Sequence, residues 1–161
     1  MKAEPQAEHR WLEQLLGAWT YEAECNMGPG KPPAKNSGRE TVRSLGGLWI
    51  VAEGLGTMPG GGEATTILTL GYDAVEKRYK GTWIGSMMAK LWLYDGTLDA
   101  AGKVLTLDSE GPSFAGDGTT ARYQDIVEIV GPDHRIFRSQ TPGPDGGWNQ
   151  FMVAHYRRQG V

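Results

Sequence analysis

The sequence predicts an all-β fold, a single antiparallel barrel of about ten strands with a short N-terminal helix against one end. Three observations lead to this prediction. Apolar and polar residues alternate with a period of two along most of the chain, which is typical of strands with one buried face. The alternating segments are short, and turn-rich segments separate them at regular spacing. Glycine occurs 24 times in 161 residues, about twice its average usage, which suits curved strands joined by tight turns.

Residues 5–16 form the one amphipathic helix that the sequence predicts. Trp11, Leu12, Leu15 and Leu16 fall on one stripe, and charged residues occupy the other positions. A proline at the start and a glycine just past the end suit the termini of a helix. We expect the apolar stripe to cover an open end of the barrel.

The most regular part of the chain lies between Leu68 and Trp92. Residues 66–72 alternate as a strand, and the polar residues 73–77 then break the pattern, as a hairpin loop does. The returning strand, 79–87, has glycines between its aromatic residues. Such glycines mark a bend, a bulge or a close backbone approach.

The rest of the chain is predicted to form further strands of the same barrel. Loops rich in glycine and proline interrupt it at 27–36, 56–62 and 110–118. The remaining strands are expected at 19–25, 39–45, 48–55, 90–98, 104–109, 119–130, 135–141 and 148–158.

Charge and composition exclude several classes of protein. The net charge is −3 without a block of like charges, which argues against nucleic-acid binding. No apolar run is long enough for a transmembrane helix, and the N-terminus lacks the apolar core of a signal peptide. Cys25 is the single cysteine, so no internal disulfide can form. We expect one soluble, cytoplasmic domain over residues 1–161, without a membrane partner; a homo-oligomer is possible.

The segment Leu16-Gly17-Ala18-Trp19, which follows the predicted helix, resembles the Gly-x-Trp opening of lipocalin-like barrels. In that superfamily the tryptophan packs near the closed end of the barrel under an arginine from the last strand. The resemblance therefore implies that Trp19 closes the barrel with Arg157 or Arg158. We expect a guanidinium within about 6 Å of the indole ring, the range of a cation–π contact.

Four further groups of residues resemble a bacterial family known as domain of unknown function 1579. They span most of the chain: Gly38-Arg39-Glu40 with Leu45-Gly46-Gly47, Leu70-Gly71-Tyr72-Asp73, Gly81-Thr82-Trp83-Ile84-Gly85-Ser86-Met87, and His155-Tyr156-Arg157-Arg158. The resemblance implies a calycin-type barrel, and it implies no established reaction.

No pattern of residues predicts a catalytic or metal site. Ser86 lacks the Gly-x-Ser-x-Gly elbow of a hydrolase and the helix that follows it. The three histidines are scattered, without the spacing of metal ligands, and the acidic loops do not follow the calcium-binding pattern. We therefore expect neither a catalytic residue nor a metal, and a protein that is not an enzyme.

A cluster of aromatic and methionine side chains is the best candidate for a binding site. Methionine adapts to irregular partners, and a barrel of this size has room for one small ligand. Simple filling of the core is the alternative, and the alternation leaves open whether Met87 or Met88 points inward. The predicted ligand-binding residues are Tyr21, Glu53, Trp83, Met87, Met88, Trp92, Tyr123 and His155.

Glu53 and His155 are the polar members of this set whose orientation is least certain from the pattern. An inward Glu53 would need a basic partner, and an outward position in solvent is favoured. Haem-binding barrels of the nitrobindin type place an iron-ligating histidine near the C-terminal end, and His155 resembles it in position. The alternation of 150–158 does not fix which face points inward, and a rim or surface position is favoured.

Three functions are consistent with the sequence. The leading one is non-catalytic binding of a small apolar or aromatic ligand inside the barrel, without a cofactor. The main alternative is a haem protein or an enzyme that uses the same cavity with His155, Tyr123 and Glu53. The third is a structural protein with a filled core.

Overall fold

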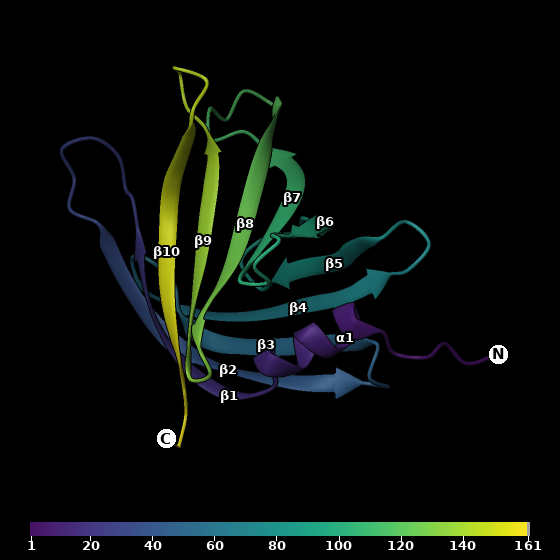
Figure 1. Cartoon of the computed structure of the whole chain (residues 1–161). Helices are drawn as coiled ribbons and strands as arrows, with labels where there is room; N and C mark the ends of the chain where they lie inside the picture. The colour runs from purple at the N-terminus through teal and green to yellow at the C-terminus, as the bar shows by residue number, and fades with distance from the viewer. Residues whose placement is uncertain (161) are drawn as a thin grey trace.

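A computed structural model describes residues 1–160 and shows a closed antiparallel barrel of ten strands (Figure 1). Each strand pairs with its neighbours in sequence, and β1 pairs with β10 to close the barrel. The fold class and the strand number predicted from the sequence are thereby confirmed. The strands are β1 (Gly17–Cys25), β2 (Ala34–Leu45), β3 (Trp49–Thr57), β4 (Glu63–Asp73), β5 (Arg78–Gly85), β6 (Trp92–Leu98), β7 (Val104–Pro112), β8 (Thr120–Gly131), β9 (His134–Pro142) and β10 (Trp148–Arg158).

The register of β1 against β10 settles which residues face the barrel interior. Trp19 lies opposite Arg158, and Tyr21 lies opposite Tyr156. Trp19 is 1% exposed, so these pairs lie on the inward face, and because side chains alternate across a strand every second residue from them points inward. The inward set of β10 is therefore the one that ends at Arg158, and His155 belongs to the outward set.

The N-terminal segment is a short helix α1 (Ala7–Trp11) that continues as a 3₁₀ turn, η1 (Leu12–Leu15). It is shorter than the predicted 5–16, since a proline precedes α1 and Gly17 already belongs to β1. Gly17 has a φ of +114°, a conformation that glycine adopts readily and that redirects the chain into the strand. Of the predicted stripe, Leu12 and Leu15 are buried, whereas Trp11 and Leu16 are half-buried against the core.

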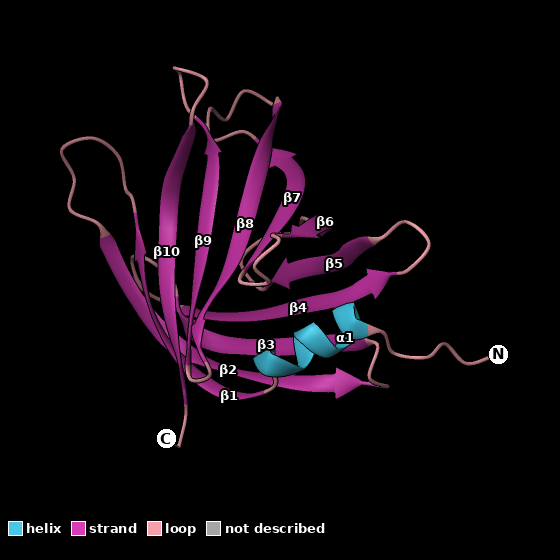
Figure 2. Cartoon of the chain, in the orientation of Figure 1, coloured by secondary structure: helices cyan, strands magenta, loops and turns pink. Residues whose placement is uncertain are grey.

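This N-terminal segment covers one end of the barrel, here called the closed end (Figure 2). The Trp11 indole N–H donates to the carbonyl of Gly102 at 2.8 Å, and the Tyr79 hydroxyl donates to the carbonyl of Glu8 at 3.1 Å. The connections at this end are the tight turns 46–48, 74–77, 99–103 and 132–133. The opposite end, here called the open end, carries the mostly longer loops 26–33, 58–62, 86–91, 113–119 and 143–147.

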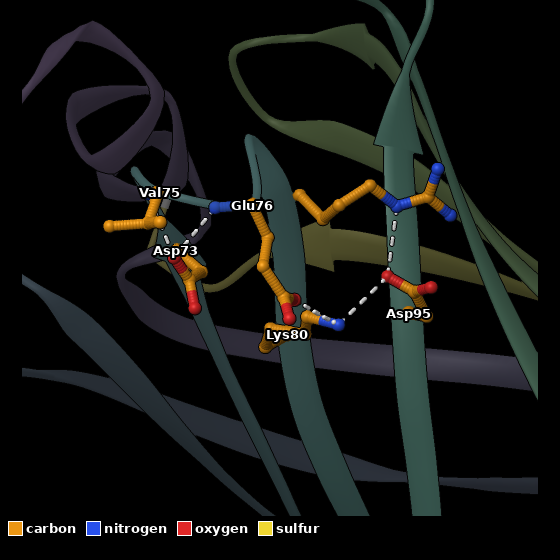
Figure 3. A network of polar contacts seen from close by, with 6 residues as sticks. Asp73, Val75, Glu76, Lys80 and Asp95 are labelled. Carbon is orange, nitrogen blue, oxygen red and sulfur yellow. Dashed lines mark hydrogen bonds and ion pairs between the residues drawn. The ribbon is translucent and has the colours of Figure 1, made fainter.

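The β4–β5 turn shows how polar side chains stabilise the closed end (Figure 3). A side-chain oxygen of Asp73 accepts hydrogen bonds from the backbone N–H groups of Val75 and Glu76, and these bonds lower the pKa of Asp73. Lys80 then bridges Glu76 at 2.7 Å and Asp95 at 3.3 Å across the outer wall. The loop predicted at 73–77 is therefore correct in place.

Some strand boundaries differ from the prediction. β2 begins at Ala34, inside the predicted loop 27–36, because the backbone of residues 34–37 pairs with β1. β7 continues to Pro112, three residues past the predicted end, because its last residues pair with β8. Within residues 1–160, no helix has the length and apolar character needed to cross a membrane.

Candidate functional site

The closed end is plugged by stacked cations and aromatic rings. The Arg135 guanidinium lies 4.7 Å from the Trp19 ring centroid and 4.1 Å from that of Tyr156, and it forms a buried ion pair with Glu40. Arg158 lies 4.2 Å from the Trp19 ring, and its guanidinium donates to the carbonyls of the N-terminal segment. These contacts confirm the predicted closure by Trp19 and Arg158.

Two details of this plug differ from the prediction. Arg157, the other predicted partner of Trp19, lies on the outer wall, because it is one residue out of step with the inward set of β10. Arg135, which the sequence did not single out, takes the second position over Trp19.

Aromatic side chains gather at the open end instead. Trp92 packs edge-to-face on Tyr123 at 5.2 Å, and Phe114 contacts Tyr123 at 5.7 Å and Phe151 at 5.0 Å, all between ring centroids. Trp83 pairs with Trp92 across β5 and β6. We call these five residues the aromatic mouth. Phe114 is 71% exposed and stands on the loop 113–119, so it partly covers the cluster.

The inner wall changes in burial from one end of the barrel to the other. Toward the closed end, Leu70, Leu105 and Leu107 are each 0% exposed. Toward the open end, the inward-facing Trp83 and Trp92 keep solvent-accessible surface. The aromatic mouth therefore presents aromatic surface to solvent, whereas the leucines of the closed half do not.

Glycines in the mouth seat the tryptophan rings. A β-carbon at Gly85 would lie 2.6 Å from the Trp83 ring and 2.5 Å from the Met87 sulfur, and one at Gly111 would clash with the Trp92 ring. The tryptophan rings and the thioether fill the space that side chains would take at these two glycines, so the glycines set the position of the rings.

Both predicted methionines lie at the rim of the open end. Met87 and Met88 are exposed in the loop 86–91, so neither is a buried member of the inner wall. Met87 reaches back over Gly85 beside Trp83, and the Met88 sulfur accepts a hydrogen bond from the Trp92 indole N–H at 3.2 Å. The sequence left open whether Met87 or Met88 points inward. In the structure, both side chains border the mouth.

A polar layer lies directly below the mouth. We give this name to Tyr94, Ser109, Asp125 and Ser139, which point inward from β6, β7, β8 and β9. The Tyr94 hydroxyl donates to one oxygen of Asp125, and the Ser139 hydroxyl donates to the other at 2.5 Å. Burial raises the pKa of Asp125 above its ordinary value, although these two hydrogen bonds oppose the shift. Burial and the Asp125 carboxylate raise the pKa of Tyr94.

Of the other predicted site residues, Tyr21 and Tyr123 face inward. The Tyr21 ring lies 5.1 Å from that of Tyr156, at an interplanar angle of 32°, on the opposite side of the interior, and the Tyr21 hydroxyl lies against Gly38 and Gly56. Tyr123 is buried at the mouth, where its hydroxyl donates to the carbonyl of Pro112. The structure therefore brings Trp83, Met87, Met88, Trp92 and Tyr123 together and places Tyr21 apart from them.

Glu53 and His155 lie on the outer wall, outside this group. Glu53 is exposed and lies 3.8 Å from Arg43, as expected for an outward carboxylate. His155 is exposed and its Nδ1 lies 3.0 Å from Nε2 of His134. Burial, then Arg157 and His155, lower the pKa of His134. A haem held by His155 would lie outside the barrel, so the residues of the interior do not fit the haem alternative through this ligand.

A groove of about 820 Å³ crosses the outer wall over β10, β1, β2 and β3. Most of its lining consists of outward side chains of both charges, among them Glu22, Lys35, His155 and Arg157. Side chains of both charges are typical of the solvent-exposed face of a strand. Within residues 1–160, no group of three or more His, Cys, Asp or Glu side chains could hold a metal ion.

Sequence reasoning missed Asp125, Phe114 and Phe151. Asp125 alternates with Tyr123 and Val127, so it shares the inward face of β8, but the neighbouring Ile126 is also apolar and hides that alternation. Phe114 and Phe151 lie in a loop and at a bulge, where alternation does not apply. Only the predicted aromatic character of this region pointed toward them.

Comparison with known proteins gives a family and a fold. The family described as "Protein of unknown function (DUF1579)" matches residues 4–158. No curated protein matches the chain.

Solved structures resemble the barrel at low sequence identity. Rv2717c from M. tuberculosis has a TM-score of 0.67 at 15% identity, covering 97% of this chain and 99% of its own. The S-type phycobiliprotein lyase CPES from Guillardia theta has a TM-score of 0.61 at 15% identity, covering 98% and 99%. EF1p2_mFAP2b, solved bound to DFHBI, has a TM-score of 0.52 at 13% identity, covering 95% and 100%. At these identities the likeness shows the fold alone.

Proposed function

Because the chain belongs to the DUF1579 family, whose description assigns no function, we propose its role from the site: non-catalytic binding of a small apolar or aromatic molecule at the aromatic mouth. The observation that carries this proposal is the contrast in burial along the inner wall. Leucines of the inner wall are fully buried toward the closed end, whereas Trp83 and Trp92 near the mouth face inward and keep solvent-accessible surface.

The chemistry of the mouth suits such a ligand. Binding sites for small molecules are mostly apolar, with a few polar groups that orient the ligand. Here Trp83, Trp92 and Phe151 supply aromatic surface, and the polar layer below supplies hydroxyl and carboxylate groups. Large aromatic side chains left accessible in one place are a usual sign of a binding surface.

Two solved structures with this fold support the proposal, but they do not identify the ligand of this chain. One barrel of this shape is solved bound to the small molecule DFHBI, and another is a phycobiliprotein lyase. Both have the fold in common with this chain. The ligand of this chain has to be sought from its own residues.

Tryptophan fluorescence provides the test. The protein is titrated with two neutral probes, a long-chain alcohol and a bicyclic aromatic alcohol, and the same titrations are repeated with Trp83→Phe and Trp92→Phe. We expect saturable quenching in the wild type, and loss of part of that signal in each variant, because these two indoles lie at the site. Trp49→Phe is the matched control, since Trp49 is exposed at the closed-end start of β3.

The titrations also separate this proposal from a filled core. If no probe gives a saturable response, the interior does not accept a ligand and the chain is a structural barrel. If Trp49→Phe loses as much of the response as Trp83→Phe and Trp92→Phe do, the probes bind to the outer surface. Either result overturns the proposal.

A further inference from the structure

The polar layer contains a carboxylate that lacks a basic partner. Asp125 faces inward from β8, and both of its hydrogen-bond partners, Tyr94 and Ser139, are neutral hydroxyl groups. Among residues 1–160, no lysine, arginine or histidine forms an ion pair with it. A carboxylate withdrawn from water is unfavourable unless it is paired with a cation.

The other inward carboxylate of this barrel shows the contrast. Glu40, at the closed end, forms a buried ion pair with Arg135. The fold therefore provides a cation for one interior carboxylate and none for the other. The carboxylate without a cation is the one that lies beneath the aromatic mouth.

Ser109 gives a second, independent sign of a missing partner. It faces inward from β7 between Tyr94 on β6 and Tyr123 on β8, and it is 9% exposed. Its hydroxyl oxygen is buried and has no hydrogen-bond partner. Buried hydroxyl groups are nearly always hydrogen-bonded, so this oxygen is free to accept a hydrogen bond from a ligand.

The mouth above these groups also suits a cation. The faces of tryptophan and tyrosine attract ammonium groups within about 6 Å of the ring centroid. The Trp92 ring already has one such neighbour, because the ammonium group of Lys90 lies 5.9 Å from its centroid at the rim. A cation that enters the mouth would pass aromatic faces before it reaches Asp125.

We propose that the ligand of this barrel is an amphipathic amine. Its protonated amine binds the Asp125 carboxylate and donates a hydrogen bond to Ser109, and its apolar or aromatic part lies against Trp83 and Trp92. This inference rests on the proposed function and specifies its ligand class. It excludes fatty-acid-like ligands from this orientation, because their carboxylate would repel Asp125.

Three probes that share one ring system test the charge of the ligand. They are 1-naphthylmethylamine, 1-naphthalenemethanol and 1-naphthoate, titrated into the full chain by isothermal calorimetry at neutral pH. We expect the amine to bind about ten-fold more tightly than the alcohol, and the carboxylate to bind most weakly, since hydrogen bonds to charged groups are the stronger ones. Asp125→Asn should remove the preference for the amine and leave the alcohol within about three-fold of wild type.

Two further variants complete the test, one as a control for charge and one for the Ser109 hydroxyl. Asp108→Asn changes the net charge equally but alters an outward carboxylate, which accepts a hydrogen bond from Gln124 at 2.9 Å, and it should keep the preference for the amine. Ser109→Ala removes a hydroxyl that has no partner within the chain, so the variant should fold as wild type and bind the amine a few-fold more weakly.

The outcomes distinguish this inference from the proposed function. Equal affinity for the amine and the alcohol, or a preference for the amine that survives in Asp125→Asn, overturns the amine assignment and leaves the proposed binding function in place. Absence of binding by all three probes overturns both. If Asp125→Asn fails to fold, an unchanged amine affinity in Ser109→Ala is the result that overturns the assignment.

Discussion

The two ends of the barrel both contain tryptophans and an inward carboxylate, but they place these side chains in different surroundings. At the closed end, two guanidinium groups lie against the Trp19 ring, and Glu40 forms an ion pair with Arg135. At the open end, tryptophans remain accessible and Asp125 has only hydroxyl partners. The two ends therefore differ in how they pair a buried carboxylate: the closed end supplies a cation for Glu40, whereas the open end supplies only hydroxyl groups for Asp125. Substitutions should therefore affect stability at the closed end and binding at the open end.

The largest expected effect is on the buried ion pair. Arg135→Ala would leave Glu40 buried without its partner and remove the cation over Trp19 and Tyr156. We expect the free energy of unfolding, measured by urea denaturation, to fall by about 3–5 kcal/mol. Arg43→Ala, which breaks the exposed pair with Glu53, is the control and should change it by less than about 1 kcal/mol. Similar losses in the two variants would show that the buried ion pair contributes no more to stability than the exposed one.

The next largest effect concerns the covering helix. Leu12, the first residue of η1 in the N-terminal segment, is 1% exposed, and Leu12→Ala should lower the free energy of unfolding by about 2–4 kcal/mol, because it leaves a cavity in the closed half. The neighbouring exposed Glu13→Ala should shift it by no more than about 0.5 kcal/mol. A thermal melt of Leu12→Ala that superimposes on wild type would mean that the segment does not contribute to the core.

Asp125 should make stability depend on pH in the direction opposite to a paired carboxylate. Its pKa is raised in the folded state, so the unfolded chain releases this proton first as the pH rises, and the contribution of Asp125 to stability falls. Tyr94 from β6 and Ser139 from β9 are the polar groups that contact it, and Leu107 from β7 lies opposite. The raised pKa of Tyr94 keeps its hydroxyl from titrating in this range.

Urea denaturation of wild type and Asp125→Asn at about pH 4.5 and about pH 7.5 measures this dependence. The neutral amide does not titrate, so the stability of wild type relative to Asp125→Asn should decline between the two values, by less than the losses expected at the closed end. A wild-type advantage that grows with pH would show that Asp125 has a cationic partner after all.

The smallest effect on stability, with a clear effect on binding, is expected at Phe114. Because this side chain is 71% exposed, Phe114→Ala should change the free energy of unfolding by less than about 0.5 kcal/mol. It should nevertheless weaken binding of the neutral aromatic probe by about two- to ten-fold, the range of one aromatic contact. Val75→Ala, which alters a still more exposed apolar residue in a closed-end turn, should change neither quantity. Unchanged probe affinity in Phe114→Ala would remove this loop from the site.

Much of the fold could be predicted because it depends on local signals. The hairpin around 73–77, the helix stripe with Leu12 and Leu15, and the Trp19–Arg158 closure all follow from alternation, periodicity or a short motif. The candidate site was predicted in part, since Trp83 and Trp92 do lie together at one end.

The features that could not be predicted from the sequence depend on contacts between distant strands. Arg135 meets Glu40 across the closed end although neither strand borders the other, and no local pattern encodes that meeting. His155 was ambiguous because both faces of its strand are half apolar, and only the pairing of β10 with β1 separates them. Asp125 was hidden because apolar residues occupy both faces of its own strand.

The seam between β1 and β10 has a consequence for the timing of folding. During synthesis on the ribosome, β1 emerges before every other strand, and its seam partner β10 emerges after all of them. Contacts between segments so far apart in sequence form slowly, because the loop between them must close first. Until then β1 presents an unpaired edge, the kind of surface that invites pairing with another nascent chain. Arg158, at the end of β10, joins Trp19 only in that last step.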